Sequence, residues 1–533
     1  MQANFQVCGG VRNAKKSQQS LVSFGIRFAS GSPLHTMWTP LAVAALSAPS
    51  NLSFIHAGDS GGFLDEAGRV RIFHGCNRVK KSAPWYFKDM LASDAEFDLL
   101  EALGFNVVRL GFMWSGFNPA PGVFNSTYLQ AIQTIVKRLA ARGIYTLLDM
   151  HEDVLSSKFC TYDGAPLWVV NKASPPKHAF PWPLKGNCSG RFWMANTLTE
   201  AAAAAYQDLY DNTRGMLDDM AAFWARGAQA FAATPSVLGY ELINEPFAGN
   251  FYADPALLLP GVAGGKNLQR MYDTVATAIY SHDTRHLLFY EPVTWGMIFD
   301  GKTAGSGFTH VPGGAAHANT SVFTFHYYCK SFVPHYETEP TLTKAVCDDA
   351  VKPLVFEAAK KETRRLGGAA FMSEGLSCDF EQKDARAECE AVMAALDKQL
   401  MSYTDYADSQ GDTFAPSQAQ QEGWARSYAR AVAGTPLNMS FDAASKAFEL
   451  CYTIDASIAA PTEVFASRTY SYPQGRAVRT TANLRAETDP ARPDVVLVRP
   501  AAARRLVEGG EGKAKAKGAG EGGGVGCVWI QKE

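Results

Sequence analysis

The chain has 533 residues, of which 47% are hydrophobic and 19% are charged, with a formal net charge of −2. These values are typical of a folded globular protein and exclude a disordered or collagen-like chain. Basic and acidic residues are nearly balanced, so the composition does not favour nucleic acid as a partner. The length is sufficient for one large domain and a smaller second domain.

The first 50 residues are expected to be a targeting segment. No acidic residue precedes Asp59, and residues 37–50 read MWTPLAVAALSAPS, a short apolar run that ends in small residues. This pattern is typical of a signal peptide and its cleavage site, and it is shorter than the ~20 apolar residues of a transmembrane span. We expect a secreted or lysosomal-type location. An organelle presequence is the alternative.

Cysteine spacing indicates disulfides rather than a metal site. The ten cysteines contain no CxxC pair, and several are near neighbours in the chain. We expect three local disulfides in an oxidising compartment, Cys160–Cys188, Cys329–Cys347 and Cys378–Cys389. Free thiols in a reducing cytosol are the alternative. Candidate N-glycosylation sequons begin at Asn51, Asn125, Asn187, Asn319 and Asn438.

Short apolar, β-rich runs alternate with longer helical stretches from about residue 70 to residue 430. Such alternation predicts parallel strands joined by helical crossovers, and eight repeats predict a (β/α)8 TIM barrel over residues 51–433. The predicted strands are 69–77, 105–112, 144–151, 238–245, 286–292, 321–328, 369–375 and 399–406.

The pattern changes after residue 433. Residues 434–500 contain short alternating runs with Pro and Gly turns, which predicts a small C-terminal β-sandwich. Residues 501–533 include a run rich in Gly and charged residues, and we expect a low-complexity disordered tail there.

Polar and ionisable side chains gather at the carboxyl ends of the predicted barrel strands. In a barrel these ends form one rim, where the catalytic residues of such enzymes lie. The residues are Lys81, Arg109, His151, Asp153, Asn244, Glu245, His326, Tyr328 and Glu374.

Glu245 and Glu374 end the fourth and seventh predicted strands, which lie on opposite sides of a barrel mouth. Cleavage of a glycoside uses two carboxyl groups, one that donates a proton and one that attacks the anomeric carbon. The pair therefore predicts a glycosidase. Two structural carboxylates in ion pairs are the alternative interpretation.

The surrounding motifs resemble glycoside hydrolase family 5 and, in finer detail, its endoglycoceramidases. They are NEP (244–246), GCNRVKKSAPWY (75–86), LLDMHEDV (147–154), FHYYC (325–329) and PTEVF (461–465). The resemblance runs from about residue 55 to residue 480. It implies a retaining enzyme that cuts the bond between glycan and ceramide in glycosphingolipids at a membrane surface, with no metal or organic cofactor.

The same resemblance implies roles for the rim residues. Glu245 is the expected acid/base and Glu374 the expected nucleophile, while Asn244 holds the sugar 2-hydroxyl. Arg109 and Tyr328 are expected to hydrogen-bond Glu374. The residues expected to bind sugar or orient the carboxylates are His151, His326, Lys81 and Asp153, with Trp85 and Trp114 as possible stacking partners.

Two departures from the family pattern concern the mouth of the site. Glu374 is followed by Gly375 and Leu376 rather than by Phe-Gly, and the eighth strand offers Tyr403 and Tyr406 where a Trp is usual. We expect Tyr403 to contribute to substrate binding. Two other functions stay open, a β-glucosidase acting on glucosylceramide, steryl glucoside or β-glucan, and an inactive carbohydrate- or lipid-binding protein.

Overall fold

The computed structural model describes residues 52–58, 61–189, 191, 193–293, 305–328, 351–376, 378–406, 411–501 and 524–533. The N-terminal segment 1–50 and the predicted Cys329–Cys347 pair lie outside the described residues. No helix within the described ranges is long and apolar enough to cross a membrane.

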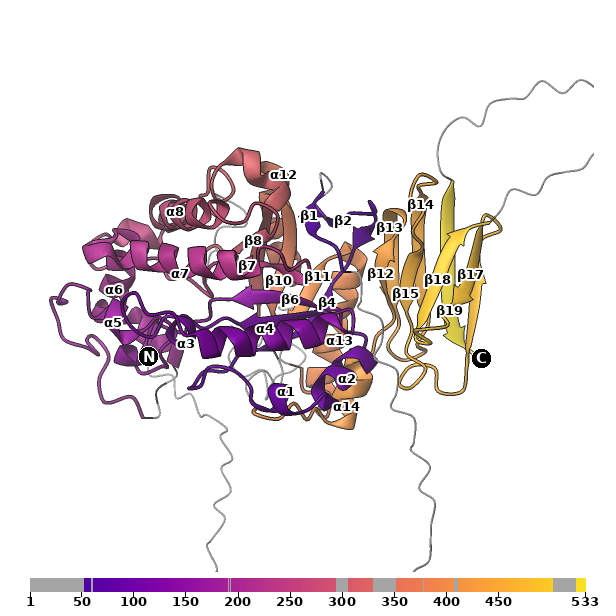
Figure 1. The fold of residues 1–533 in the computed structure, drawn as a ribbon, viewed down its shortest axis with the longest axis horizontal. Coiled ribbons are helices and arrows are strands. Elements are labelled where there is room, and N and C mark those ends of the chain that lie inside the picture. Colours follow the sequence, from indigo (N-terminus) through magenta and orange to yellow (C-terminus); the bar gives the residue numbers. More distant parts are fainter. Residues whose placement is uncertain are drawn as a thin grey trace, which may run out of the picture. The chain divides into compact units, whose positions relative to one another are not determined.

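Eight parallel strands form a closed barrel (Figure 1), which confirms the predicted fold class. The ring closes where β11 pairs with β4, with Tyr403 opposite His74. Residues 70–71, predicted as the start of the first barrel strand, belong to another sheet. The barrel strands are β4 (His74–Arg78), β5 (Val107–Gly111), β6 (Tyr145–Asp149), β7 (Val237–Glu241), β8 (Leu287–Tyr290), β9 (Ser321–Tyr327), β10 (Ala369–Gly375) and β11 (Ser402–Asp405).

Helices cover the outside of the barrel (Figure 1). In α4, Ile132, Ile135 and Leu139 recur at helical spacing and are buried, and the side chain of Asn125 caps the first turn by accepting from the Tyr128 N–H. The helices are α1 (Asp89–Ala92), α2 (Ala95–Ala102), α3 (Trp114–Phe117), α4 (Ser126–Ala140), α5 (Leu167–Val170), α6 (Glu200–Tyr210), α7 (Met216–Phe231), α8 (Gln269–Tyr280), α12 (Lys352–Leu366), α13 (Lys383–Gln399) and α14 (Gln418–Trp424). Shorter helical turns are η1 (Ser157–Phe159), η2 (Trp193–Leu198), η3 (Thr213–Gly215), η4 (Pro255–Leu258), η5 (Gly264–Leu268) and η6 (Ala315–Thr320).

The N-terminal end of the barrel is filled with hydrocarbon. Phe63 packs edge-on against Phe73 and Phe371, with ring centroids 5.3 and 6.2 Å away. Neighbouring strands approach each other closely here. A Cβ at Gly75 would lie 1.9 Å from the Val107 carbonyl oxygen, and one at Gly239 would lie 2.2 Å from the Leu287 carbonyl oxygen. Glycine is therefore required at both positions.

Two antiparallel sheets follow, as predicted for the C-terminal β-sandwich, although their boundaries differ from the prediction. The seven-stranded sheet has the order β1-β2-β3-β12-β15-β18-β17, and the four-stranded sheet has the order β13-β14-β19-β16. The strands are β1 (Ile55–Ala57), β2 (Phe63–Asp65), β3 (Val70–Arg71), β12 (Tyr428–Val432), β13 (Gly434–Phe441), β14 (Phe448–Ile454), β15 (Thr462–Phe465), β16 (Arg476–Thr480), β17 (Leu484–Thr488), β18 (Val495–Pro500) and β19 (Val525–Lys532).

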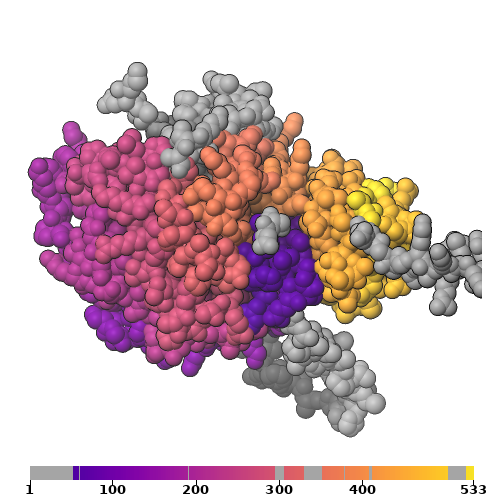
Figure 2. Space-filling view, turned by 90° about the horizontal axis from the view of Figure 1, so that it is seen from above, coloured from indigo at the N-terminus to yellow at the C-terminus, as the bar shows by residue number. Residues whose placement is uncertain are grey.

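The first sheet therefore joins strands that precede the barrel to strands that follow it. In the space-filling view, N-terminal residues in indigo lie between the barrel and the later strands (Figure 2). This agrees with β3 pairing to β12 and with β1 contacting β8 and β9. The sandwich thus includes residues that precede the barrel, although the sequence predicted that these residues belong to the barrel domain.

Strand β19 corrects the expectation of a disordered tail over its last residues. Val528 and Ile530 are buried at alternate positions, and the strand pairs with β14 and β16. A disulfide between Cys451 and Cys527 links β14 to β19 and was not predicted. The burial of alternate apolar side chains explains why this strand forms, although a Gly-rich run precedes it.

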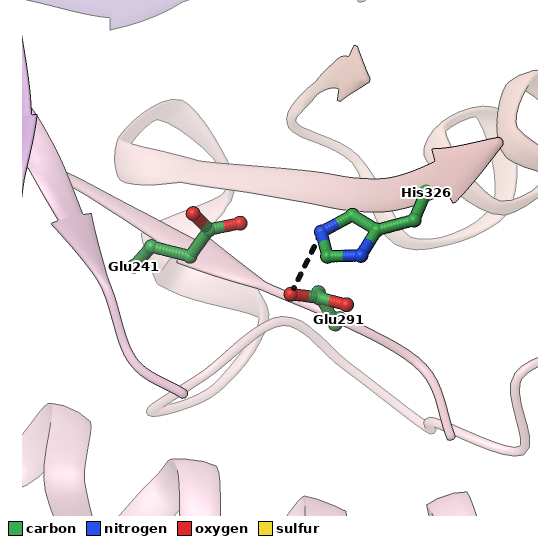
Figure 3. Close-up of side chains that lie close together, drawn as sticks. All are labelled: Glu241, Glu291 and His326. Carbon is green, nitrogen blue, oxygen red and sulfur yellow. Dashed lines mark ion pairs between the residues drawn. The ribbon is translucent and has the colours of Figure 1, made fainter. Parts of the chain in front are cut away.

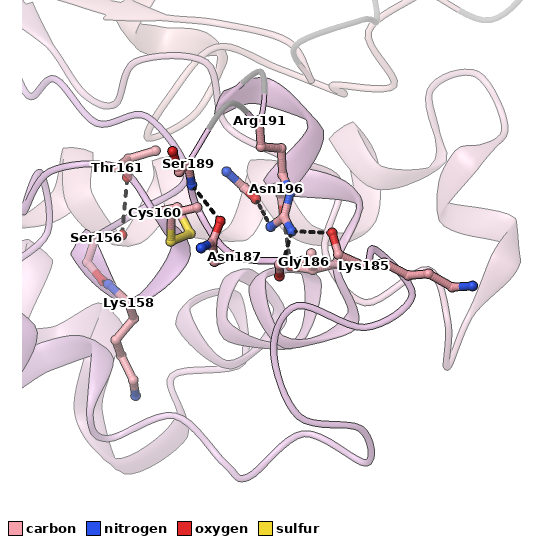
Figure 4. Close-up of a disulfide and its surroundings, with 12 residues drawn as sticks. Ser156, Lys158, Cys160, Thr161, Lys185, Gly186, Asn187, Ser189, Arg191 and Asn196 are labelled. Carbon is pink, nitrogen blue, oxygen red and sulfur yellow. Dashed lines mark hydrogen bonds between the residues drawn. A yellow bond between two sulfur atoms is a disulfide. The ribbon is translucent and has the colours of Figure 1, made fainter. Parts of the chain in front are cut away.

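Two of the predicted disulfides are present, Cys160–Cys188 and Cys378–Cys389. The first ties together the long segment that follows β6 (Figure 4). Arg191 holds the same segment by donating to the Asn196 side chain at 2.9 Å and to the Lys185 carbonyl at 2.9 Å (Figure 4). These links anchor a long loop on the carboxyl side of the barrel.

Candidate active site

Two of the predicted rim residues lie just beyond the end of β7. The strand ends at Glu241, four residues before the predicted end, and Leu242 and Ile243 continue the buried chain. Asn244 and Glu245 then follow, with Glu245 at φ 43°, in the left-handed region. A non-glycine residue with such a backbone is uncommon and is typical of functional sites.

Arg109 is the centre of the site and is fully buried. Its guanidinium forms ion pairs with Glu241, with Asp149 at 3.0 Å and with Glu374 at 2.6 Å. It also donates to the side-chain oxygen of Asn244 at 2.9 Å. A planar guanidinium can satisfy several acceptors at once, so one side chain fixes four residues at the ends of three strands.

Glu374 is directed into the barrel by an irregularity in β10. The pairing of β10 with β9 shifts between Met372 and Glu374. Such a bulge reverses the alternation of side chains, so that Glu374 faces inward although Met372 belongs to the outer core. One carboxylate oxygen accepts from Arg109, and the other accepts from the Tyr328 hydroxyl at 2.9 Å.

Glu245 lies across the mouth from Glu374. A carboxylate oxygen of each residue lies, together with one ring nitrogen of His326, in a group whose atoms are all within 4.8 Å of one another. The Nδ1 atom of His326 is 2.8 Å from Glu245 and 3.6 Å from Glu374. The structure thus brings together the two predicted carboxylates and the histidine expected to orient them.

Asn244 is held rigidly between two partners. Its side-chain oxygen accepts from Arg109, and its amide nitrogen donates to the Glu152 carbonyl at 2.9 Å. The second hydrogen of the amide nitrogen is free to serve another acceptor.

His151 follows the end of β6, and its Nδ1 atom lies 2.6 Å from Asp149. Burial and the nearby Lys81 keep the pKa of His151 well below its usual value, so the ring is neutral. Burial raises the pKa of Asp149 to about 7, although Arg109 opposes that rise. A neutral imidazole can both donate and accept a hydrogen bond, as recognition of a hydroxyl group requires.

Lys81 and Asp153 form an ion pair at 2.5 Å beside this histidine. The ammonium of Lys81 faces the rings of Tyr162 and Tyr406, each 5.3 Å from the ring centroid. Burial lowers the pKa of Lys81, but Asp153 and Tyr406 outweigh it and leave the pKa raised. The structure therefore gathers all predicted rim residues except Tyr403.

Tyr403 and Trp114 do not lie at this site. Tyr403 faces away from the barrel interior and contacts His74, with ring centroids 4.5 Å apart. Trp114 is fully buried in the outer core, and its ring centroid lies 5.7 Å from that of Phe223. Tyr406, one of the two tyrosines offered by the eighth strand, is the one that reaches the mouth.

Several residues of the site were not predicted from the sequence. Each lies inside or directly beside a predicted strand, where a polar side chain among apolar neighbours was the available signal. They are Asn77, Asp149, Glu152, Glu241 and Glu291.

Two groups of carboxylates share His326 and have ligand atoms within 4.8 Å of one another, Glu241–Glu291–His326 (Figure 3) and Glu245–His326–Glu374. Burial lowers the pKa of His326, but Glu291, Glu374 and Glu245 outweigh it and raise the pKa to about 10. These carboxylates therefore favour the doubly protonated, cationic form of the ring at neutral pH.

Comparison with known proteins identifies the family. Residues 66–411 match the family described as cellulase (glycosyl hydrolase family 5), and residues 426–506 match the glycoside hydrolase family 5 C-terminal domain. The chain belongs to glycoside hydrolase family 5. It is therefore a glycoside hydrolase, as the carboxylate pair predicted.

Two similar proteins are endoglycoceramidases. An endoglycoceramidase of Cyanea nozakii is 37% identical over 425 residues, covering 74% of this chain and 80% of the relative. One of Hydra vulgaris is 37% identical over 443 residues, covering 77% and 80%. The solved lactosyl-enzyme intermediate of endo-glycoceramidase II from Rhodococcus sp. has the same fold, with a TM-score of 0.68 and 23% identity over 90% of this chain and all of that one.

Proposed function

We propose that the protein is a retaining β-glycosidase that cleaves the bond between glycan and lipid in glycosphingolipids. The facing Glu245 and Glu374 carboxylates carry this proposal. Their oxygens lie within 4.8 Å, near the ~5 Å separation that suits a covalent intermediate and well below the ~6.5–9.5 Å of inverting enzymes. The two endoglycoceramidases of Cyanea nozakii and Hydra vulgaris support the choice of substrate class.

In the first step, the Glu374 carboxylate attacks the anomeric carbon and forms an ester with the sugar. The bond from that carbon to the lipid oxygen breaks, and the oxygen keeps the electron pair and takes the proton of Glu245. Arg109 and Tyr328, which donate to the two oxygens of Glu374, hold the nucleophile in place. The products are the free lipid and a glycosyl-enzyme.

In the second step, water attacks the anomeric carbon of the glycosyl-enzyme. The Glu245 carboxylate takes a proton from that water, and Glu374 leaves as a carboxylate. Both residues then have the protonation states with which the cycle began. Two inversions at one carbon retain the configuration of the sugar.

The other rim residues bind the glycan. Asn244 donates the free hydrogen of its amide to the 2-hydroxyl of the sugar next to the cleaved bond. Lys81, Asp153 and the neutral His151 hydrogen-bond hydroxyl groups further along the glycan, beside Tyr406. These contacts use side chains already fixed by ion pairs, so binding orders few additional groups.

The enzyme acts as a peripheral protein at a membrane surface, because the lipid part of its substrate lies in a bilayer. The three disulfides of the described chain support an oxidising, secretory or lysosomal-type compartment. The sequence of residues 1–50 supports the same route.

Product analysis tests this function. The protein is incubated with a ganglioside that carries a fluorescent ceramide, and separately with glucosylceramide and a steryl glucoside, with Glu374→Gln as the matched control. Release of intact oligosaccharide and free ceramide supports the proposal. Release of glucose alone, with the ganglioside untouched, supports a β-glucosidase instead. Binding without release from any substrate would show an inactive carbohydrate- or lipid-binding protein.

A further inference from the structure

Glu291 is a buried carboxyl group at the rim that the two-step reaction does not use. It follows the end of β8 and is 2% exposed. The hydroxyl of Tyr272 donates to its backbone carbonyl at 2.8 Å and accepts from its backbone N–H at 3.2 Å. Its backbone is therefore fixed by α8, and its side chain is presented to the site from a rigid position.

The Glu291 carboxylate faces both Glu245 and His326. Its Oε1 atom accepts from the backbone N–H of Glu245 at 3.3 Å and lies 3.4 Å from the Nε2 atom of His326. In Figure 3 the dashed line joins the imidazole to Glu291, and the Glu241 carboxylate faces the same part of the ring. On its remaining nitrogen, His326 contacts the Glu245 carboxylate at 2.8 Å.

His326 thus has a carboxylate against each ring nitrogen. Both nitrogens then carry a hydrogen, and the ring is a cation at neutral pH. The charged groups around it come from five barrel strands or the segments that follow them. They are Glu241, Glu245, Glu291, Glu374, Arg109 and Asp149.

Burial raises the pKa of Glu291 well above its usual value, and the facing His326 cation opposes that rise. The His326 cation therefore favours the ionised form of Glu291, and the Glu291 carboxylate in turn favours the cation. The other carboxylates next to Arg109 have that guanidinium as their cation, whereas Glu291 faces the imidazole. The charge of Glu291 therefore acts on Glu245 through the imidazole ring of His326.

We propose that Glu291 is a positioning residue that acts through His326, keeping the imidazole cationic and the Glu245 carboxyl in place for proton donation. This proposal rests on the function proposed above. When Glu245 gives its proton to the lipid oxygen, the resulting carboxylate is stabilised by the His326 cation. Glu291 neutralises that cation throughout, and the proton count of the reaction is unchanged.

Glu291→Gln removes the charge and keeps an oxygen that can accept from the Glu245 N–H. Without the negative charge of Glu291, the His326 cation loses its proton at lower pH. The basic limb of the kcat/KM profile on a glycolipid should therefore move down by about one to two pH units. Glu291→Asp, which keeps the charge, should retain the shape of the wild-type profile at a lower rate.

Glu362→Gln is the matched control. Glu362 is equally buried but lies on α12, where it pairs with Arg365 and Ser306. This variant should lower the unfolding temperature and leave the shape of the pH profile unchanged. If Glu291→Gln behaves in the same way, Glu291 is only structural and the proposal is overturned.

The leaving group provides a second test. A dinitrophenyl β-lactoside needs no proton on its leaving oxygen, whereas a glycolipid does. Glu291→Gln should lose on the order of tenfold in kcat on the glycolipid and much less on the aryl glycoside, because only the first requires acid catalysis. Equal losses on both substrates would contradict a role in proton donation.

The charge of the ring is measured in the wild-type protein without any variant of Glu291. In protein labelled with 15N-histidine, the two ring nitrogens of His326, assigned with His326→Gln, should give imidazolium shifts at pH 8. A neutral ring at that pH overturns the proposal, even if Glu291→Gln does not fold. If neither substrate is cleaved, the proposed function fails, while this measurement still decides the state of His326.

Discussion

The two ends of the barrel are built from the same strands but have opposite character. At the N-terminal end, Phe63, Phe73 and Phe371 pack edge to edge in a hydrocarbon core. At the carboxyl end, Arg109 is surrounded by carboxylates. Strand β10 supplies Phe371 to one end and Glu374 to the other.

This difference separates stability from chemistry along each strand. Hydrocarbon packing at one end contributes favourable free energy at every contact. The buried charges at the other end require exact pairing, because an unpaired buried charge costs several kcal/mol. Substitutions at the two ends should therefore have different consequences.

The largest effect on activity is expected at the nucleophile. Glu374→Gln should lower kcat by ~1,000-fold or more, because the amide cannot form the glycosyl ester. The unfolding transition should change little, since Gln keeps the size of the side chain. The measurement is turnover of a fluorescent glycolipid alongside thermal unfolding, and near-normal turnover would remove Glu374 from the mechanism.

Arg109→Met should damage both properties at once. The carboxylates of Asp149, Glu241 and Glu374 would lose their shared cation, at a cost of about 3–5 kcal/mol in the free energy of unfolding. Activity should fall to the level of Glu374→Gln, because the nucleophile is no longer held. Urea unfolding measures the first effect, and a loss below 1 kcal/mol, on the order of a surface ion pair, would contradict the pairing seen here.

Phe371→Ala should affect stability alone. The side chain is fully buried between Phe63 and Phe289, and its removal should cost about 3–5 kcal/mol. The kcat of the folded fraction should match the wild type, since the carboxyl end keeps its contacts. A large fall in kcat without loss of stability would show that the two ends are not separable.

The pH dependence of stability distinguishes the charged end. Because its carboxylate neighbours raise the pKa of His326 to about 10, the folded protein binds this proton more tightly than the unfolded chain does. The resulting stabilisation is complete below about pH 6.5 and is lost as the pH rises to about 10. His326→Gln should flatten the fall of the unfolding temperature over this window, and an unchanged slope would contradict the assignment.

The smallest effect is expected at Tyr406, and Tyr403 in the preceding strand β11 serves as its comparison. Tyr406→Leu removes the ring that faces Lys81 and should raise KM two- to fivefold, from a loss of about 0.5–1 kcal/mol. Tyr403→Phe should leave KM unchanged, because Tyr403 faces the outer core. Initial-rate kinetics on one glycolipid decide between them, and the reverse result would restore Tyr403 to the site.

The sequence was sufficient for the elements and the principal residues. Eight apolar runs predicted eight strands, and polar residues at their ends predicted the rim. It could not decide between Tyr403 and Tyr406, because a four-residue strand of mixed polarity does not reveal which face points inward. Glu241 and Glu291 were missed because each is a single acid within an apolar run, and β19 because it follows a Gly-rich segment.

The central claim is that Glu374 forms a covalent bond to the sugar. A 2-deoxy-2-fluoro lactoside with a good leaving group slows the second step more than the first, so the glycosyl-enzyme should accumulate. Peptide mass spectrometry should then find one glycosyl adduct, on Glu374. An adduct on another carboxylate, or hydrolysis with inversion and no adduct, would contradict the account.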